Sequence, residues 1–148
     1  MGGTAPITTR ADYLDFYPLQ TRWMDNDAYG HMNNVVHYSL FDTAVNGWLI
    51  ERGLLDPRTS ETYGLVVESG CKYHDEMGFP DRVTAGLRVA RLGSSSIKYE
   101  VALFRNDENR ATAEGFFIHV YVNRETHRPS PIEDERRVAF QSLMRMNT

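Results

Sequence analysis

The chain has 148 residues, a length typical of one folded domain. Hydrophobic residues make up 41% of the chain, enough for a core, and 20 acidic against 16 basic residues give a net charge of −4. This acidic balance argues against a nucleic-acid-binding module, which is normally basic. No apolar stretch reaches the length of about 20 residues that a membrane-spanning helix needs, so no membrane association is expected.

The N-terminal residues and the cysteine content bear on location and domain organisation. Residues 1–12 lack the apolar centre of a signal peptide and are predicted to form a disordered tail. Residues 13–148 contain no linker or internal repeat, so they are predicted to form a single domain. The only cysteine, Cys71, has no partner for an internal disulfide, which favours a cytoplasmic protein.

The first regular elements are a strand and a long helix. The segment "YLDFYPLQTRW", residues 13–23, predicts a strand that starts at or is interrupted by Pro18. Farther along, apolar residues recur every four positions in two neighbouring rows, and Gly53 suits a helix end, so a helix is predicted over 33–52. The two rows consist of Val36, Leu40, Ala44 and Trp48, and of Phe41, Val45 and Leu49.

The rest of the chain alternates with a period of two, which is typical of strands. Short turn sequences, "GSS" near 93–95 and "NDEN" at 106–109, separate the later strands as hairpins. A final amphipathic segment predicts a short helix that begins near Pro131. This order of strands and helices predicts an α+β fold with a sheet packed against the long helix. The later strands of the sheet are expected at 63–77, 81–92, 95–106 and 111–123.

The stretch "RWMDNDAYGHMNN" before the long helix concentrates hydrogen-bonding groups. Asp25 and Asp27 lie in a loop, Gly30 permits a tight turn, and Asn33 or Asn34 is suited to cap the helix. Unpaired N–H groups at a helix start can bind a carbonyl oxygen that becomes an oxyanion, and a nearby carboxylate can act as nucleophile or base. The same residues are also common turn formers and caps, so spacing alone leaves both interpretations open.

Other catalytic and metal-binding patterns are missing from the sequence. No HxH, HExxH or CxxC motif is present, so no metal site is expected. The "GSSS" stretch differs from the G-x-S-x-G motif and is interpreted as a turn. Of the remaining histidines, His37 is expected on a helix face, His74 at the surface and His119 in the interior or at an interface.

The loop and the helix that follows it resemble the hotdog-fold acyl-CoA thioesterases of the 4-hydroxybenzoyl-CoA thioesterase type. The resemblance extends over nearly the whole chain after Tyr13. It implies a curved antiparallel sheet wrapped around the long helix, in a homodimer or in a tetramer made of two dimers. The matching residues are Arg22, Asp25, Asp27, Gly30, His31, Met32, Asn33 and Asn34.

The resemblance also implies an active site between protomers. Asp27 matches the catalytic carboxylate, Asp25 and Gly30 shape the loop near the substrate, and the N–H groups from His31 to Asn34 polarise the thioester. His31 or Asn33 positions water or substrate. A second protomer contributes Glu68 and the turn of Ser94, Ser95 and Ser96.

The implied reaction is hydrolysis of an acyl-CoA to a free acid and CoA. It needs neither a metal nor a cofactor, because CoA belongs to the substrate. The acyl group and the carrier, CoA or acyl carrier protein, stay open. Two alternatives share the fold: a hydratase or dehydratase that acts on acyl thioesters, and a non-catalytic acyl-CoA-binding protein. The presence of Asp27 favours the hydrolase.

Overall fold

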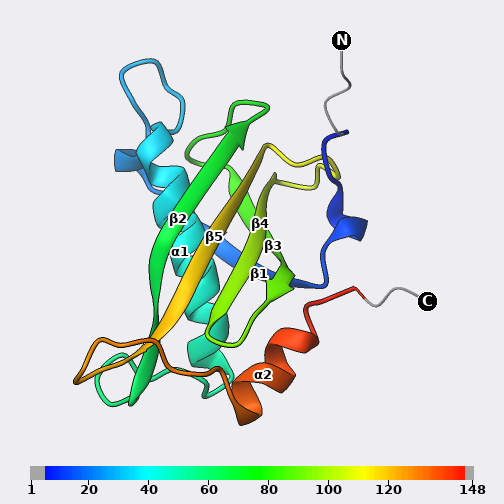
Figure 1. Cartoon of the computed structure of the whole chain (residues 1–148). Helices are drawn as coiled ribbons and strands as arrows, with labels where there is room; N and C mark the ends of the chain where they lie inside the picture. The colour runs from blue at the N-terminus through cyan, green and yellow to red at the C-terminus, as the bar shows by residue number, and fades with distance from the viewer. Residues whose placement is uncertain (1–5, 146–148) are drawn as a thin grey trace.

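The computed structural model describes residues 6–145. One long helix lies against one face of a twisted sheet, and a short helix lies at one end of that sheet (Figure 1). This is the predicted α+β arrangement. Its elements are β1 (Asp15–Gln20), α1 (Asn34–Glu51), β2 (Thr62–Tyr73), β3 (Arg82–Leu92), β4 (Ser96–Arg105), β5 (Ala113–Asn123) and α2 (Asp134–Gln141), with short 3-10 helices at Arg10–Asp12 and Trp23–Asp25.

The sheet has five strands in the order β1-β3-β4-β5-β2, and every neighbouring pair is antiparallel. The strand that follows the helix, β2, pairs with the last strand, β5, and forms one edge of the sheet. This edge carries a bulge between Val66 and Glu68. The edge strand matters for function because its unpaired backbone groups are available to another strand.

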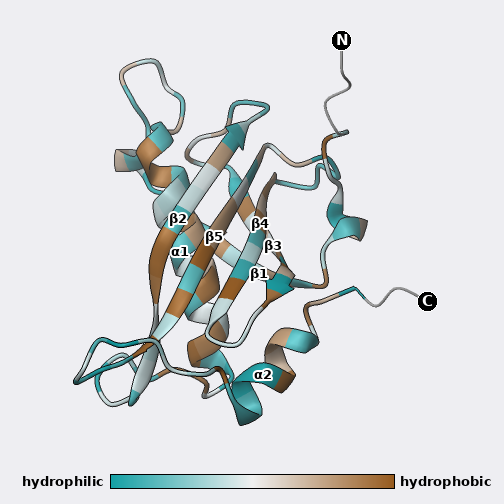
Figure 2. Cartoon of the chain, in the orientation of Figure 1, coloured by the Kyte–Doolittle hydropathy of each residue, from teal (hydrophilic) through white to brown (hydrophobic). Residues whose placement is uncertain are grey.

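The core lies between α1 and the sheet. Both apolar rows predicted for the helix face inward, except that Val36 is only partly buried. Trp48 is 2% exposed, and its ring stacks on that of Phe140 from α2. Hydrophobic residues gather on the strands and on the helix behind them, whereas α2 and the turns beside it are largely hydrophilic (Figure 2).

Both ends of α1 follow the predicted signals. Asn33 Oδ1 accepts a hydrogen bond from Val35 N at 3.0 Å and so caps the start of the helix. At the other end Gly53 adopts φ +69°, which favours glycine, and its N–H donates to Ile50 O at 3.0 Å. The helix therefore spans the predicted range to within one residue at each end.

Several strand and helix ends differ from the predictions. β1 is shorter than the predicted 13–23, and α2 begins at Asp134, three residues after Pro131. β2 ends at Tyr73 although alternation continued to residue 77. There the chain leaves the sheet because the N–H groups of His74 and Asp75 both donate to Thr112 O, which ends the regular ladder.

The segment predicted as a disordered tail also differs in its second half. Thr8 donates to Glu114 Oε2 through both its N–H, at 3.0 Å, and its hydroxyl, at 2.6 Å. Thr9 forms a bridge with Arg110, and Ile7 packs against a small apolar cluster beside the sheet. The physical reason is long-range pairing, which no local sequence pattern announces. Residues 1–5 of the predicted tail lie outside the described residues.

Candidate active site

The loop before α1 is held by Asp25. This side chain is 1% exposed and accepts three hydrogen bonds from Arg22: from N at 2.7 Å, from Nε at 3.0 Å and from Nη2 at 2.9 Å. Its carbonyl oxygen accepts from Asn33 N at 2.9 Å, which fixes the loop to the start of the helix. The carboxylate of Asp25 is thus engaged inside the chain and holds the loop near the predicted substrate site, while a contact of Asp25 with substrate stays a prediction.

Asp27 has a different environment. Its Oδ1 accepts hydrogen bonds from Tyr29 N at 2.8 Å and His31 N at 3.2 Å. Gly30, at φ +81°, closes this turn and donates from its N–H to Asp27 O at 3.1 Å. Within the described residues, Oδ2 of Asp27 makes no hydrogen bond. One oxygen therefore fixes the carboxylate, and the other has no hydrogen-bond partner in this part of the chain.

Fewer backbone N–H groups are free at the start of α1, among the described residues, than the sequence suggested. His31 N donates to Asp27, Met32 N donates to Met77 O at 2.7 Å, and Asn33 N donates to Asp25 O. In this run only the N–H of Asn34 makes no hydrogen bond among residues 6–145. Among the four N–H groups predicted to polarise the thioester, that of Asn34 is therefore the candidate donor, and its contact with substrate stays a prediction.

A cavity of about 360 Å³ lies in front of this loop, and we call it the Asp27 cavity. Asp27, His31 and Asn34 line one wall, so the structure brings three predicted site residues together. The side-chain oxygen of Asn33 caps the helix, as predicted for Asn33 or Asn34, and the contact of Asn33 with water or substrate stays a prediction. The opposite wall is formed by residues that the sequence reasoning missed: Tyr73, His74, Asp75, Glu76 and Met77.

The two walls are joined by contacts. His31 Nε2 lies 3.0 Å from Glu76 Oε2, and Tyr73 donates from its hydroxyl to Asn34 O at 3.4 Å. The ring of Tyr73 meets the edge of His37 at a centroid distance of 4.8 Å. The run "YHDEM" of polar residues at a strand end was the available signal, because polar groups at such ends often line sites.

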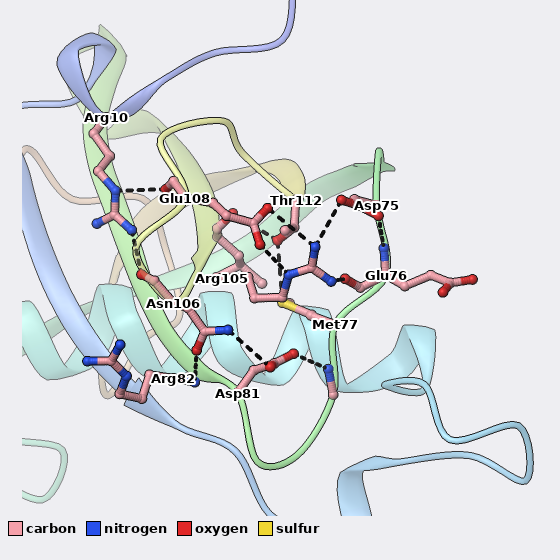
Figure 3. Close-up of polar contacts among 12 residues, drawn as sticks. Arg10, Asp75, Glu76, Met77, Asp81, Arg82, Arg105, Asn106, Glu108 and Thr112 are labelled. Atoms are coloured by element: carbon pink, nitrogen blue, oxygen red, sulfur yellow. Dashed lines mark hydrogen bonds and ion pairs between the residues drawn. The ribbon is translucent and has the colours of Figure 1, made fainter.

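Arg105, at the end of β4, holds the opposite wall in place (Figure 3). Its Nη2 lies 3.2 Å from Asp75 Oδ2, its Nε donates to Glu108 Oε2 at 2.7 Å, and its Nη1 donates to Glu76 O. Glu108 raises the pKa of this guanidinium, which therefore keeps its charge. The wall of the cavity is thus tied to the sheet and not only to the loop.

Besides His31, two further histidines with distinct environments line the cavity. His37 is 4% exposed, and burial lowers its pKa, so its imidazole is neutral near pH 7. It was expected on a helix face, and the structure shows that this face is buried. His74 was expected at the surface, yet it is half-buried, and its Nε2 lies 2.6 Å from Glu114 Oε1.

Four predicted substrate contacts lie away from Asp27 within one chain. Glu68 is exposed on the edge strand β2. Ser94, Ser95 and Ser96 lie at the far end of β3, one strand length of roughly 30 Å from the loop side. Ser95 O and Ser94 O accept from Tyr121 N and Ile132 N at that far end. These residues can reach the Asp27 cavity only from a second copy.

The fold and the site define a hotdog-fold thioester hydrolase. The model of the thioesterase-like superfamily matches residues 21–140, and the chain belongs to this family. Among curated proteins, none shows significant similarity to the chain. Within residues 6–145 there is no helix long and apolar enough to cross a bilayer, nor a group of three acidic, histidine or cysteine side chains placed to hold a metal ion.

Several solved structures have the same fold. The PA5185 protein of Pseudomonas aeruginosa PAO1 is 52% identical over 94% of this chain and 97% of its own, with a TM-score of 0.91. PA2801 of P. aeruginosa, a provisionally assigned thioesterase, is 28% identical over 86% of this chain and 98% of its own, with a TM-score of 0.80. The gentisyl-coenzyme A thioesterase BH1999 is 24% identical over 85% of this chain and 99% of its own, with a TM-score of 0.75.

Proposed function

We propose that the protein hydrolyses an acyl thioester of coenzyme A to a free acid and CoA, with Asp27 as the reacting carboxylate. The observation that carries this proposal is the position of Asp27, held through one oxygen at the start of α1 in a cavity of about 360 Å³. Membership in the thioesterase-like superfamily supports thioester hydrolysis in general. BH1999, a distant structural relative, acts on gentisyl-coenzyme A.

The chemistry at Asp27 can follow two routes. In the first, Oδ2 bonds to the thioester carbon, the C–S bond breaks, CoA leaves as thiolate, and water hydrolyses the mixed anhydride. In the second, Asp27 takes a proton from water as the water oxygen bonds to the same carbon, and the tetrahedral oxyanion then collapses with cleavage of the C–S bond and release of CoA as thiolate. In both routes Asn34 N–H donates to the developing oxyanion. A thiol with a pKa of about 8.5 leaves readily, so strong acid assistance is unnecessary.

A second copy completes the proposed site. Leu65, Val66 and Val67 on the edge strand β2 are exposed, at 40%, 49% and 60%. We infer that β2 pairs with β2 of a second copy, because an exposed apolar edge strand is otherwise a site of aggregation. The pairing supplies Glu68 and the turn at Ser94, Ser95 and Ser96 from the neighbouring subunit. Pairing of two such dimers into a tetramer stays a prediction.

The single cysteine is consistent with the proposed location. Cys71 is partly buried and unpaired in the structure. Burial raises its pKa to about 11, so the thiol is not ionised near neutral pH and is a poor nucleophile. A chain without an internal disulfide suits a reducing compartment, and we propose a cytoplasmic location.

The first experiment measures thiol release from short, medium, long and aromatic acyl-CoAs by wild type and Asp27→Asn, with the same acyl groups on acyl carrier protein in parallel. We expect release by wild type and its loss in the variant. Binding without release would contradict hydrolysis. A single turnover in heavy-oxygen water distinguishes the two routes, because only direct attack places solvent oxygen in the side chain of Asp27.

The pairing is tested by Val67→Lys, which places a charge on the exposed edge. We expect the molecular mass in light scattering to fall from that of a dimer to that of a monomer, with loss of turnover. Val138→Lys is the matched control, since Val138 is 67% exposed and belongs to α2, not to the edge strand β2. A wild-type monomer with full turnover would show that one chain is sufficient.

A further inference from the structure

A second cavity lies near the other end of α1, and we call it the His119 cavity. Its volume is about 170 Å³, and its wall includes Leu49, Leu55, Pro57, Tyr63, His119 and Tyr121. Leu49 lies fifteen residues after Asn34, about 22 Å farther along the helix. The Asp27 cavity and the His119 cavity of one chain are therefore too far apart to share a small ligand.

Among the described residues, Arg124 is the one charged side chain in the wall of the His119 cavity, and no acidic side chain lines it. Arg124 donates from Nε to Ser60 O at 2.6 Å and from Nη2 to Pro57 O at 3.0 Å, and its guanidinium lies over the ring of Tyr63. Asn46 donates from Nδ2 to Asp42 O at 3.0 Å. Two of the three guanidinium nitrogens and the amide nitrogen are thus engaged inside the chain, and the other side chains of the wall are uncharged, so the cavity suits an uncharged group.

His119 is the buried polar side chain of this wall. It is 3% exposed, and its Nε2 makes no hydrogen bond within the described residues. A Cβ atom at position 64 would lie 2.7 Å from its Nδ1, so glycine there leaves room for the ring. Burial lowers the pKa of His119 to about 4, which keeps it neutral. A buried nitrogen without a partner costs free energy, and a ligand bound beside it can remove that cost.

The proposed pairing of β2 with a second copy brings the two kinds of cavity together. Two copies related by a two-fold axis pair this strand antiparallel, so the start of one strand meets the end of the other. Tyr63 of the His119 cavity is at the start of β2, and Tyr73 of the Asp27 cavity is at its end. Residues of α1 line both cavities, so both open on the helix side of the sheet.

The geometry points to the His119 cavity as the acyl-group pocket of the active site whose Asp27 belongs to the other copy, and to a compact uncharged acyl group as its ligand. This inference rests on the proposed hydrolysis and pairing. An apolar cavity of about 150 Å³ holds one benzene molecule. A pocket of about 170 Å³ thus admits one ring or a short branched chain and excludes a long fatty chain.

The test compares kcat/KM for isovaleryl-CoA, benzoyl-CoA and palmitoyl-CoA in wild type and two variants. Leu55→Trp fills the pocket, whereas Ile50→Trp adds the same ring at a position that is 46% exposed and outside it. We expect kcat/KM of wild type to be about ten-fold or more higher for a compact substrate than for palmitoyl-CoA. We expect Leu55→Trp to lower kcat/KM for compact substrates by about ten-fold, mainly by raising KM. We expect Ile50→Trp to behave as wild type.

A second measurement does not depend on turnover. Benzamide, an uncharged single ring, is titrated into wild type while the ring ¹⁵N signals of His119 are followed by NMR, and a saturable shift is expected. Hydrolysis that is equally fast for palmitoyl-CoA and unaffected by Leu55→Trp overturns the inference and leaves the hydrolase intact. Failure of every thioester, with the benzamide shift retained, overturns hydrolysis while the pocket stands as a binding site. Absence of both overturns the pocket.

Discussion

The two ends of α1 are ordered by different forces. At its start, the loop of residues 22–33 is fixed by hydrogen bonds to Asp25 and Asp27, while Trp23 and Tyr29 remain 78% and 84% exposed. At its far end, Leu49 and Trp48 are buried in the core, and a glycine ends the helix. The comparison teaches that the reactive end depends on a few polar contacts, whereas the other end depends on apolar burial.

The largest effect is expected from Asp27→Asn, which tests whether the rate of hydrolysis depends on the polar loop at the start of α1. The amide oxygen can still accept from Tyr29 N and His31 N, so the turn is retained and the charge is lost. We expect kcat/KM for the best acyl-CoA to fall by roughly 10²–10⁴-fold.

Its control is thermal unfolding of the same preparation, in which Asp27→Asn should match wild type. A variant that unfolds early would place Asp27 among the groups that hold the loop, together with Asp25. A stable variant with unchanged turnover would remove Asp27 from the mechanism.

Asp25→Ala tests whether polar contacts order this end at all. It removes the acceptor of three hydrogen bonds from Arg22 and opens a space where a 1% exposed side chain was. We expect the free energy of unfolding in urea to fall by about 2 kcal/mol, since Arg22 is 64% exposed and stays solvated after its partner is removed. Asp107→Ala, at an ion pair whose side chains are 74% and 94% exposed, is the control and should change it little. Equal effects would contradict the role assigned to Asp25.

His119→Phe tests the far end of α1 through the pH dependence of the free energy of unfolding. Burial lowers the pKa of His119 from 6.5 to about 4, so the unfolded chain takes up a proton at a pH where the folded protein does not. Stability from this site therefore falls as pH decreases from about 7 to about 4, by about 2 kcal/mol at pH 4.5. Urea unfolding at pH 7 and 4.5 should show a smaller loss in the variant, with a remainder from His37, whose pKa burial also lowers.

The smallest effect is expected from Asn33→Ala, which removes the cap of α1. Asn33 Oδ1 accepts from Val35 N, and a lost cap of this kind costs about 1 kcal/mol of stability. Asn33→Asp keeps an acceptor and should restore the urea midpoint. A large loss of turnover in Asn33→Asp at wild-type stability would instead support the role in positioning substrate that the resemblance implied.

Much of the fold could be predicted because apolar periodicity records burial directly. The rows of α1, containing Leu40 and Phe41, and the alternation of β3 to β5 all correspond to buried faces. Strand ends were harder to predict, since β2 stops where Thr112 O accepts two N–H groups from a different part of the chain. The pairing of Thr8 with Glu114, 106 residues away, has no local signal either.

The candidate site could be predicted only where its residues are close together in the sequence. Asp27, His31 and Asn34 fall within one short motif, so the sequence indicated them together. The wall from Tyr73 to Met77 was missed because its link to the loop is a long-range hydrogen bond from Met32 N to Met77 O. The occupancy of the helix N–H groups likewise depends on backbone partners, which residue identities alone do not specify.

The edge position of β2 has a consequence for mixed assemblies. Under the proposed pairing, each active centre takes Asp27 from one subunit and the pocket around Leu55 from the other. A population containing Asp27→Asn and Leu55→Trp chains would include heterodimers in which one centre carries both lesions and the other carries neither. Two preparations, one inactive and one impaired toward compact substrates, would regain activity on being unfolded together and refolded, as in genetic complementation between alleles.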